Sequence, residues 1–279
     1  MHHSNHFYGH AHIFARYCGL NANDPPRIRG NLQHGWNLVH GFGFLHGVEP
    51  GYPKFVWSEV VQRRAWALGW RDYYVTGAPW IYLMAMEPDL GRVPEDRREG
   101  TIWYPFHGWE YNGVDGDHDR LIAEIKATEP GPVTVCLYWL EYRDERVRAL
   151  YEDAGFRVIC HGYRGRRWRD TTTDFLYNQL AEMRRHRRVA SNRVTSALLY
   201  GALAGCEPAV YGDPMLLEGA DPRYGDANRG NRLYPELLGV KVDLEAARAI
   251  AERELGHAHL APPEEIRLLF GWPEPAGVA

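Results

Sequence analysis

Residues 188–214 read RVASNRVTSALLYGALAGCEPAVYGDP, with a short apolar run on either side of a longer one. The short runs at 188–190 and 208–211 have the length of buried strands, and the run at 195–204 has the length of a helix. Gly205 follows the long run and is the residue type that most often ends a helix. A strand, a helix and a second strand in this order form a unit whose two strands are parallel, so the segment predicts an α/β fold with a parallel sheet.

The same alternation of strand and helix patterns extends through the rest of the chain. From residue 100 onward we expect further strands at 101–105, 132–140 and 157–161, and further helices at 118–127, 143–154 and 174–185. Before residue 100 we expect strands at 28–32, 54–58 and 72–76 and helices at 12–18 and 59–68. Two more helices are expected at 244–255 and 263–270. The predicted fold class is α/β, with two Rossmann-like domains of which the N-terminal one is shortened.

A polar segment with Pro and Gly, EPDLGRVPEDRREG at 87–100, is the best candidate for a linker between the two domains. We therefore predict an abbreviated first domain at 1–92, a second domain at 93–240, and C-terminal helices at 241–279 that pack back on the first domain. The second domain contains the polar stretch EGADPRYGDANRGNR at 218–232, which we expect to be a surface loop.

The composition is that of a globular protein and excludes a fibre or an extended disordered chain. The 279 residues are 45% hydrophobic and 24% charged, and the formal net charge of -4 argues against a general nucleic-acid binder. No apolar run reaches the roughly 20 residues of a membrane span. The four cysteines have no CxxC pairing, so we expect reduced thiols and a cytoplasmic location. A homo-oligomer remains an open possibility.

Histidines are frequent near the N-terminus, at His2, His3, His6, His10 and His12. They are interrupted by other residues and have no cysteines or carboxylates beside them at the spacing of metal ligands. We therefore expect no metal site and no resident cofactor.

Polar residues directly after the predicted strands are the first candidates for a functional site, because open parallel sheets bind ligands at the carboxyl ends of their strands. Four segments qualify: QHG at 33–35, FHGWE at 106–110, HGY at 161–163 and SNRVTS at 191–196. Three of them contain a His-Gly step. Gly permits a tight turn there, and His can accept a proton or donate to a phosphate oxygen.

The segment 191–196 is the clearest candidate for an anion site. A helix that begins here presents free backbone N–H groups and the positive end of its dipole. Four side chains add polar groups: Ser191, Asn192, Thr195 and Ser196. His107 is a weaker candidate for the same role. Simpler interpretations remain open, since one of the hydroxyls can serve only as an N-cap and His107 can be a structural histidine bonded to a backbone carbonyl.

Three stretches resemble the two-domain glycosyltransferase fold called GT-B: YPFHGWE at 104–110, ASNRVTSALLYGALAGCEPAVYGDP at 190–214, and QHG at 33–35. Within that fold they are similar to a loose group of enzymes. The group holds the capsule Kdo transferases and bacterial sialyltransferases, which use CMP-sugars, and the CDP-glycerol glycerophosphotransferases. The stretch 190–214 looks like the helix and strand that hold the donor phosphate in this group, and QHG resembles the loop that supplies a catalytic base.

The resemblance implies a metal-independent, inverting glycosyltransferase that takes a nucleotide-sugar donor and an acceptor with a hydroxyl group. The base is then His34, with His40 and Glu110 in reserve. The donor phosphates are expected against His107, Ser191, Asn192, Thr195 and Ser196. The nucleoside is expected near the ends of neighbouring strands, against Glu141, His161, Gly162 and Tyr163.

Two other functions remain open for the same residues. A nucleotide-sugar epimerase or hydrolase of the same fold would turn over the donor without an acceptor. A non-catalytic binding protein derived from the fold would bind without turnover. At the level of single residues, His34 can instead bond only a backbone group of the Gly-rich loop, and Tyr163 can be a surface aromatic.

Overall fold

The computed structural model describes residues 3–42, 51–165, 170–219 and 226–275. The chain divides into two compact units. Unit 1 comprises Met1–Asp89, Tyr163–Tyr177 and Glu252–Ala279, and unit 2 comprises Leu90–Gly162 and Asn178–Ala251. The first boundary, after Asp89, lies inside the polar segment 87–100. The sequence did not lead us to expect that Tyr163–Tyr177 would group with unit 1.

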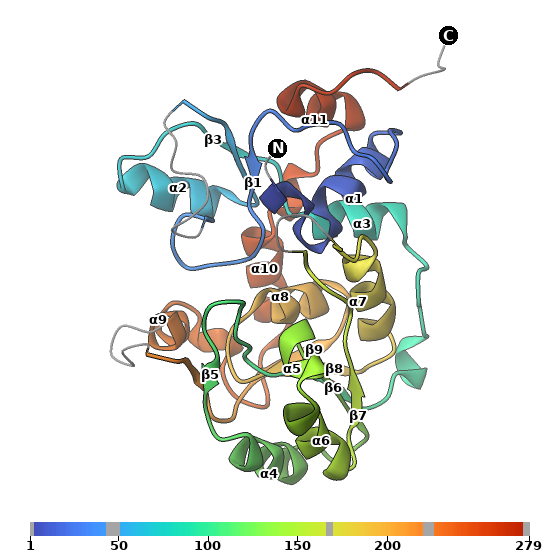
Figure 1. Ribbon diagram of the computed structural model, residues 1–279, viewed down its shortest axis with the longest axis vertical. Coiled ribbons are helices and arrows are strands. Elements are labelled where there is room, and N and C mark those ends of the chain that lie inside the picture. The colour runs from blue at the N-terminus through green and yellow to red at the C-terminus, as the bar shows by residue number, and fades with distance from the viewer. Residues whose placement is uncertain (1–2, 43–50, 166–169, 220–225, 276–279) are drawn as a thin grey trace. The chain divides into compact units, whose positions relative to one another are not determined.

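Unit 2 is built on a five-stranded parallel sheet (Figure 1). Its strands in chain order are β4 (Thr101–Tyr104), β6 (Val133–Cys136), β7 (Arg157–Ile159), β8 (Arg188–Ser191) and β9 (Glu207–Val210). In space the order is β7-β6-β4-β8-β9, so the chain moves outward from β4 in one direction and then returns to build the other half. This is the 3-2-1-4-5 order of a Rossmann-like sheet.

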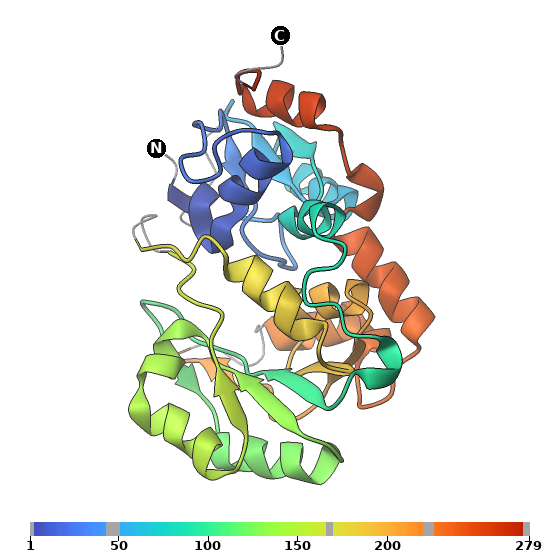
Figure 2. The same ribbon diagram turned by 90° about the vertical axis from the view of Figure 1, so that its right-hand side faces the viewer.

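Helices cover both faces of this sheet (Figure 2). On one face lie α4 (His118–Thr128) and α6 (Glu145–Asp153), and on the other lie α8 (Ser196–Leu203) and the C-terminal part of α7 (Phe175–Met183). Successive strand residues point to opposite faces, which is why both Ile102 and Trp103 of β4 are fully buried.

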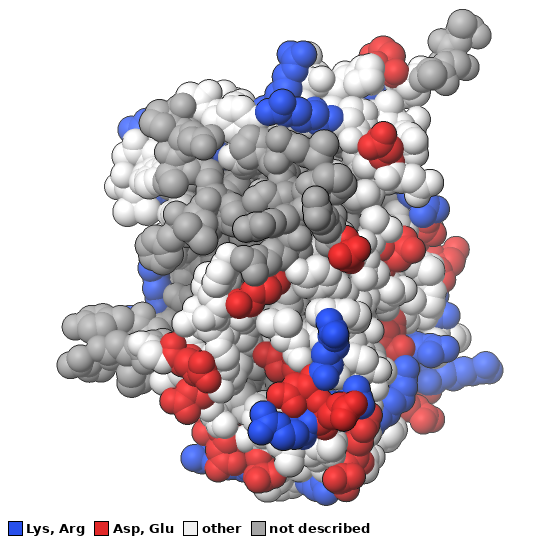
Figure 3. Space-filling view, viewed as in Figure 1, with Lys and Arg blue, Asp and Glu red and all other residues white. Residues whose placement is uncertain are grey.

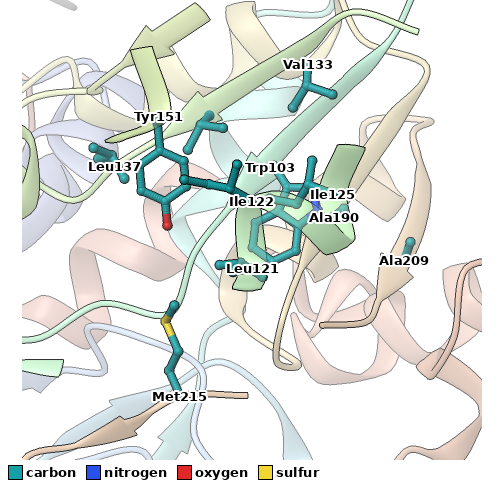
Figure 4. Close-up of a cluster of buried hydrophobic side chains, with 11 residues drawn as sticks. Trp103, Leu121, Ile122, Ile125, Val133, Leu137, Tyr151, Ala190, Ala209 and Met215 are labelled. Carbon is teal, nitrogen blue, oxygen red and sulfur yellow. The ribbon is translucent and has the colours of Figure 1, made fainter. Parts of the chain in front are cut away.

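The core under α4 and α6 is a continuous apolar cluster (Figure 4). Its buried members come from both helices and four of the strands, and from the segments that follow β6 and β9: Trp103, Leu121, Ile122, Ile125, Val133, Val135, Leu137, Tyr151, Ala190, Ala209 and Met215. The periodicity of α4 explains its part in the cluster, because Leu121, Ile122 and Ile125 share one face of the helix. The side chain of Asp117 caps α4 by accepting a hydrogen bond from the backbone N–H of Arg120.

Two predicted features of this region were wrong, and one small sheet was not predicted. The expected strand at 132–140 ends at Cys136, and a short helix, α5 (Trp139–Arg143), follows it. The expected surface loop at 218–232 contains most of a helix, α9 (Asp226–Leu233). A two-stranded antiparallel sheet of β5 (Val114–Asp115) and β10 (Leu216–Leu217) was not predicted.

Unit 1 contains a smaller parallel sheet of three strands, β1 (Asn31–Leu32), β2 (Lys54–Val56) and β3 (Tyr73–Val75), in the order β1-β2-β3. Its helices are α1 (His10–Tyr17), α2 (Glu59–Ala67), α3 (Pro79–Met86) and α11 (Pro263–Phe270), of which α3 was not predicted. The C-terminal helix packs into this core, since the ring centroid of Phe270 lies 4.8 Å from that of Phe55 and 5.0 Å from that of Phe14.

The remaining elements are short or shared by the units. Helix α10 (Leu244–Glu254) spans the boundary at residue 251, and four 3-10 helices complete the described chain: η1 (His3–Gly9), η2 (Glu95–Arg97), η3 (Pro235–Leu237) and η4 (His257–His259). The prediction of a mixed α/β protein with parallel sheets is confirmed. The Rossmann-like strand order is seen in unit 2, whereas unit 1 has three strands of two or three residues.

The surface and the cysteines bear on the expectations drawn from composition. Basic and acidic side chains are interspersed over α4 and α6 on the face shown in Figure 3, so that face presents no field of a single sign. All four cysteines are free thiols. Among the described residues, no helix has both the length and the apolar character needed to cross a bilayer.

Candidate functional site

The two halves of the unit 2 sheet meet between β4 and β8, where the direction of the strand order changes. In register, Tyr104 at the end of β4 pairs with Ser191 at the end of β8. The loops that begin at Pro105 and Asn192 therefore start side by side. Open α/β sheets bind ligands at the carboxyl ends of the strands at such a switch point, which makes these two loops the candidate site.

Asn192 ties the two loops together. Its side-chain oxygen accepts a hydrogen bond from the backbone N–H of Phe106 at 2.7 Å, and its side-chain amide donates to the carbonyl of Asp213 at 2.6 Å. Asn192 is buried, as is Ser191, whose hydroxyl accepts a 3.4 Å hydrogen bond from the backbone N–H of Arg193. These bonds make both side chains supports of the loop, and their expected contact with a phosphate stays a prediction.

Arg193 is part of the site that the sequence analysis missed. Its guanidinium lies 3.7 Å above the ring centroid of Phe106. Nε donates to the carbonyl of Pro214 at 2.5 Å, and the guanidinium also donates to the carbonyl of Met215. Arg193 is only 8% exposed, and its positive charge is held against the loops after β4 and β9. No signal in the sequence distinguishes it from the many other arginines.

Helix α8 begins next to these loops, and no side-chain hydrogen bond from its N-cap residue caps its N-terminus. The N-cap is Thr195, which makes no capping hydrogen bond, and its Oγ1 is buried without a hydrogen-bond partner in the described part of the chain. The first hydrogen bond into the helix is donated by the backbone N–H of Leu199, so the amides before it have no partner within the helix. Ser196 occupies the first helical position. The backbone N–H groups of this first turn and the positive end of the helix dipole suit an anion.

The loop after β4 places His107 at the surface of the same edge. Nδ1 of His107 lies 2.7 Å from the carbonyl oxygen of Gly108, and its ring stacks on Tyr138 with centroids 4.4 Å apart. A carbonyl oxygen only accepts, so Nδ1 carries the proton in this contact. Nε2 can then donate to an anion only when the ring is an imidazolium.

Two carboxylates approach this loop. Oε1 of Glu141 accepts from the backbone N–H of Gly108 at 2.8 Å, while its Oε2 is buried without a hydrogen-bond partner among the described residues. Glu110 accepts a 3.4 Å hydrogen bond from the hydroxyl of Tyr138. A Cβ at Gly108 would lie 2.6 Å from the carbonyl oxygen of Asn112, so only glycine fits this turn. His107, Glu110 and Glu141 are thus brought together around Gly108 and Tyr138.

The remaining residues expected at the nucleoside, His161, Gly162 and Tyr163, are consecutive in the chain and follow β7 (Arg157–Ile159). His161 is 4% exposed, and its Nε2 lies 2.9 Å from the hydroxyl of Tyr104. Burial lowers the pKa of His161 to about 4, which keeps it neutral. Gly162 follows it in unit 2, at a φ of 117°. Tyr163 groups with unit 1, where its backbone N–H donates to the hydroxyl of Thr172 at 2.9 Å.

The carboxyl edge of the unit 1 sheet holds His34. The preceding residue, Gln33, is fully buried and accepts a 3.0 Å hydrogen bond from the backbone N–H of Trp57, just after β2. The half-buried ring of His34 meets the ring of Phe7 edge to face at 5.4 Å. His10 is fully buried and lies close enough to His34 to interact with it electrostatically. The pKa of His10 is lowered to about 3, mainly by burial and secondly by His34.

His40 has a different environment from His34. Its ring stacks on Trp70 with centroids 5.2 Å apart, and its Nδ1 lies 3.3 Å from the hydroxyl of Tyr73. Burial lowers its pKa. Trp70 lies in the loop that leads into β3, and Tyr73 is the first residue of that strand. His40 is therefore held by residues at the amino end of β3.

Glu254 was not predicted from the sequence, and His10 belongs to the interrupted run of histidines that was not expected to form a site. Glu254 has no exposed surface, and its Oε2 accepts a 3.0 Å hydrogen bond from the indole N–H of Trp36, two residues after His34. Its Oε1 lies 3.6 Å from Nε of Arg253. Neither His10 nor Glu254 follows a strand, so reasoning from strand ends could not select them. Within the described ranges, no group of three or more His, Cys, Asp and Glu side chains is arranged to hold a metal ion.

The fold and site define a mixed α/β protein whose larger unit has a polar, donor-rich switch point. Comparisons with protein-family models and with curated protein sequences find no match. Among solved structures, the chain is similar to a histidine-to-alanine variant of the wall teichoic acid polymerase TagF, with a TM-score of 0.36 and 10% sequence identity. The match covers 85% of this chain and only 61% of that chain's length. A likeness of this degree assigns neither a common fold nor a function.

Proposed function

We propose that the chain is a metal-independent glycosyltransferase that moves a sugar from a nucleotide-sugar donor to an acceptor hydroxyl with inversion. The observation that carries the proposal is the convergence, at the unit 2 switch point, of the uncapped start of α8 with the loop after β4. The amides, Thr195 and Ser196 are the proposed phosphate contacts, with His107 donating when protonated. Asn192 and Ser191 hold the loop that presents them and remain proposed phosphate contacts themselves.

The proposed reaction breaks the bond between the sugar's anomeric carbon and the phosphate oxygen of the nucleotide. The acceptor oxygen forms the new bond from the opposite side, and its proton passes to His34. The departing nucleotide carries the negative charge, which the dipole and hydrogen-bond donors at the start of α8 stabilise. Charge stabilisation of this kind is often the largest contribution to rate.

The nucleoside is proposed to lie on the β6 side of the phosphates. Glu141 supports this placement, because its buried Oε2 can accept a hydrogen bond from a ribose hydroxyl while Oε1 keeps the backbone of Gly108 in place. The buried His161 is proposed to act indirectly, by holding the hydroxyl of Tyr104. Gly162 and Tyr163 remain proposed contacts of the nucleoside, with Glu110 and His40 as proposed reserve bases.

A thermal-shift panel of CMP, CDP, UDP, GDP and dTDP tests the proposed donor site. A nucleotide that binds the folded state increases the free energy of unfolding by mass action, by about 2.7 kcal/mol at 100 times its Kd, and so raises the melting temperature. We expect at least one nucleotide to do so, and we expect the shift to shrink when Thr195 and Ser196 are both replaced by alanine. Thr128→Ala, at the C-terminal end of a different helix, α4, is the matched control because the helix dipole has the other sign there.

The same panel separates the other functions. Absence of any shift across all five nucleotides would contradict the donor site. If the corresponding nucleotide sugar is turned over without an acceptor, the chain is an epimerase or hydrolase. If it binds and is not turned over with any of a set of hydroxyl acceptors, the chain is a binding protein.

A further inference from the structure

Two large aromatic side chains of unit 1 are exposed to solvent, one on α2 and one on the neighbouring strand β3. Trp66 is 47% exposed and Tyr74 is 45% exposed. By contrast, Trp57 and Trp80 of the same unit are buried, at 1% and 0% exposed. Two exposed aromatic side chains that line one hollow are a candidate binding surface.

The two rings line a hollow together with charged neighbours. Its lining consists of Trp66, Arg71, Asp72, Tyr73 and Tyr74, and its volume is about 440 Å³. Pockets that take small molecules usually measure about 300 to 1,000 Å³. All five residues lie in the segment that runs from the end of α2 into β3. The hollow therefore lies at the amino end of β3, whereas His34 follows the carboxyl end of β1.

The charged groups of the hollow are fixed in place. Nη1 of Arg71 donates to the carbonyls of Trp66 at 3.2 Å and Trp70 at 3.0 Å. Asp72 has a φ of 62°, in the left-handed region that a residue other than glycine seldom adopts. Its backbone carbonyl accepts from the N–H of Lys54 at 2.8 Å, and its Oδ2 accepts from the N–H of Gly51 at 3.0 Å. Such uncommon backbone geometry is often found at binding sites, and here it presets the position of the carboxylate.

We infer that this hollow binds a neutral saccharide. The C–H faces of a sugar ring can pack on the rings of Trp66 and Tyr74, while neighbouring hydroxyls accept from Arg71 and donate to Asp72 at once. The formal charges of Arg71 and Asp72 cancel, so the hollow favours an uncharged ligand. A purely apolar partner would make no hydrogen bonds of its own to the guanidinium or the carboxylate and would take both partly out of water, which is costly.

This inference goes beyond the proposed function and does not depend on it. The inferred saccharide site lies at the amino edge of the unit 1 sheet, whereas His34 lies at its carboxyl edge. It takes no part in the proposed chemistry, so its loss should leave nucleotide binding in unit 2 unchanged.

The test is direct binding of saccharides to the full chain. The probes are glucose, galactose and N-acetylglucosamine, with the β-1,4-linked trimers of glucose and N-acetylglucosamine, measured by saturation-transfer NMR and by tryptophan fluorescence. We expect at least one probe to bind saturably with a Kd no weaker than about 10 mM, or about 2.7 kcal/mol. Trp66→Ala should weaken it at least about tenfold, the equivalent of 1.4 kcal/mol.

Two further variants keep the test independent of misfolding. Asp72→Asn removes the charge and tolerates the left-handed backbone, because asparagine is among the residues that adopt it; it should weaken binding about fivefold, a typical loss for one hydrogen bond. Leu68→Ala is the matched control, since Leu68 is 55% exposed nearby and does not line the hollow. It should bind like the unmodified chain.

Three results would overturn the inference. The first is that no probe binds saturably below 10 mM, a threshold of about 2.7 kcal/mol. The second is that Trp66→Ala and Asp72→Asn bind as tightly as Leu68→Ala. The third is that the chain self-associates through this surface, with Trp66→Ala shifting it to a monomer in sedimentation; the patch is then a protein interface.

Discussion

In unit 2 the side chain of Asn192, directly after β8, accepts a hydrogen bond from the backbone N–H of Phe106, which follows the neighbouring strand β4. In unit 1 the side chain of Gln33, directly after β1, accepts one from the backbone N–H of Trp57, which follows the neighbouring strand β2. Both side chains are buried amides. Each sheet therefore fixes its carboxyl edge by the same physical device, in which a side chain continues the hydrogen bonding between strands after the ladder ends.

The two edges differ in what the chain places after that amide. Asn192 is followed by the fixed positive charge of Arg193 and by the uncapped start of α8. Gln33 is followed by His34, beside a second histidine, His10, that burial keeps neutral. The edge of unit 2 thus gathers hydrogen-bond donors and positive charge, and the edge of unit 1 presents an imidazole, His34, that we propose as the proton acceptor. A common scaffold at the strand ends leaves the chemistry to the next few residues.

The largest effect is expected from the proton acceptor. His34→Ala should lower turnover by about 10² to 10⁴ and leave nucleotide affinity unchanged, because a general base acts on the reacting proton and not on the donor. The fall in rate at acid pH that protonation of His34 produces should also disappear. Steady-state kinetics with the nucleotide sugar, run beside calorimetry, measure both quantities.

His40→Ala is the matched control for this variant. Its ring is held by Trp70 and Tyr73, so it should keep most of the activity. Near-native turnover of a folded His34→Ala variant would move the base to His40 or Glu110, and equal losses in both histidine variants would remove the distinction drawn here.

The proposed phosphate contacts at the carboxyl edge of the unit 2 sheet are tested by removing two hydroxyl groups. Replacing Thr195 and Ser196 together with alanine should weaken nucleotide binding by about 1 to 3 kcal/mol, the usual range for hydrogen bonds to charged groups. The backbone amides at the start of α8 remain, so binding should weaken without vanishing. Isothermal titration calorimetry measures the loss, and an unchanged affinity would reject the phosphate assignment.

The sequence predicted the scaffold of unit 2 better than its site. The alternation of apolar runs and helix-ending glycines placed β4, α4 and α8 within a residue or two of their observed bounds. It failed where one apolar run served two elements, since β6 and α5 share the run 132–140 and periodicity cannot separate a buried strand from a short buried helix.

Local sequence also cannot tell a supporting side chain from a contacting one. Asn192 and Thr195 are both polar residues after a strand, and only the tertiary structure shows that the amide of Asn192 is bonded on both sides while Oγ1 of Thr195 is not. His10 and Glu254 belong to the edge of unit 1 through contacts distant in sequence, so no local pattern selects them.

A buried histidine with a strongly lowered pKa in each unit, His10 in unit 1 and His161 in unit 2, should make that unit sensitive to acid. The pKa of His10 is lowered to about 3 and that of His161 to about 4, in both cases mainly by burial. Unfolded imidazoles take up a proton near pH 6.5, so below that pH the unfolded state binds protons that the folded state does not. Stability is fully present above pH 6.5 and falls below it, by about 2 kcal/mol for each histidine at pH 5.

Urea unfolding between pH 5 and pH 8 checks this sign and size. His10→Gln and His161→Gln should each be less stable at pH 8 and should each show a shallower loss of stability towards pH 5. If the two units unfold separately, each substitution should flatten only the transition of its own unit. A variant with the same slope as the unmodified chain would show that its histidine is not neutral in the folded state.

The smallest expected effect concerns Glu141, which adds an acceptor to the edge that otherwise gathers donors. In Glu141→Gln the amide oxygen is pinned by the backbone N–H of Gly108, which must donate to it. The amide nitrogen then takes the place of Oε2 and cannot accept from a ribose hydroxyl. The affinity for the nucleotide should fall about fivefold, or about 1 kcal/mol, while the turn at Gly108 stays intact.

Deoxynucleotides make this prediction specific. If Oε2 receives the 2′- or 3′-hydroxyl, one of the two deoxy analogues should bind the unmodified chain about fivefold more weakly than the ribonucleotide, the loss expected for one hydrogen bond. The Glu141→Gln variant should then bind that analogue and the ribonucleotide alike, since the lost hydroxyl and the lost acceptor are the two ends of one interaction. If the substitution instead weakens all analogues by the same factor, Glu141 only holds the loop after β4. The edge of unit 2 would then consist of donors alone, and the contrast with the edge of unit 1 would be sharper.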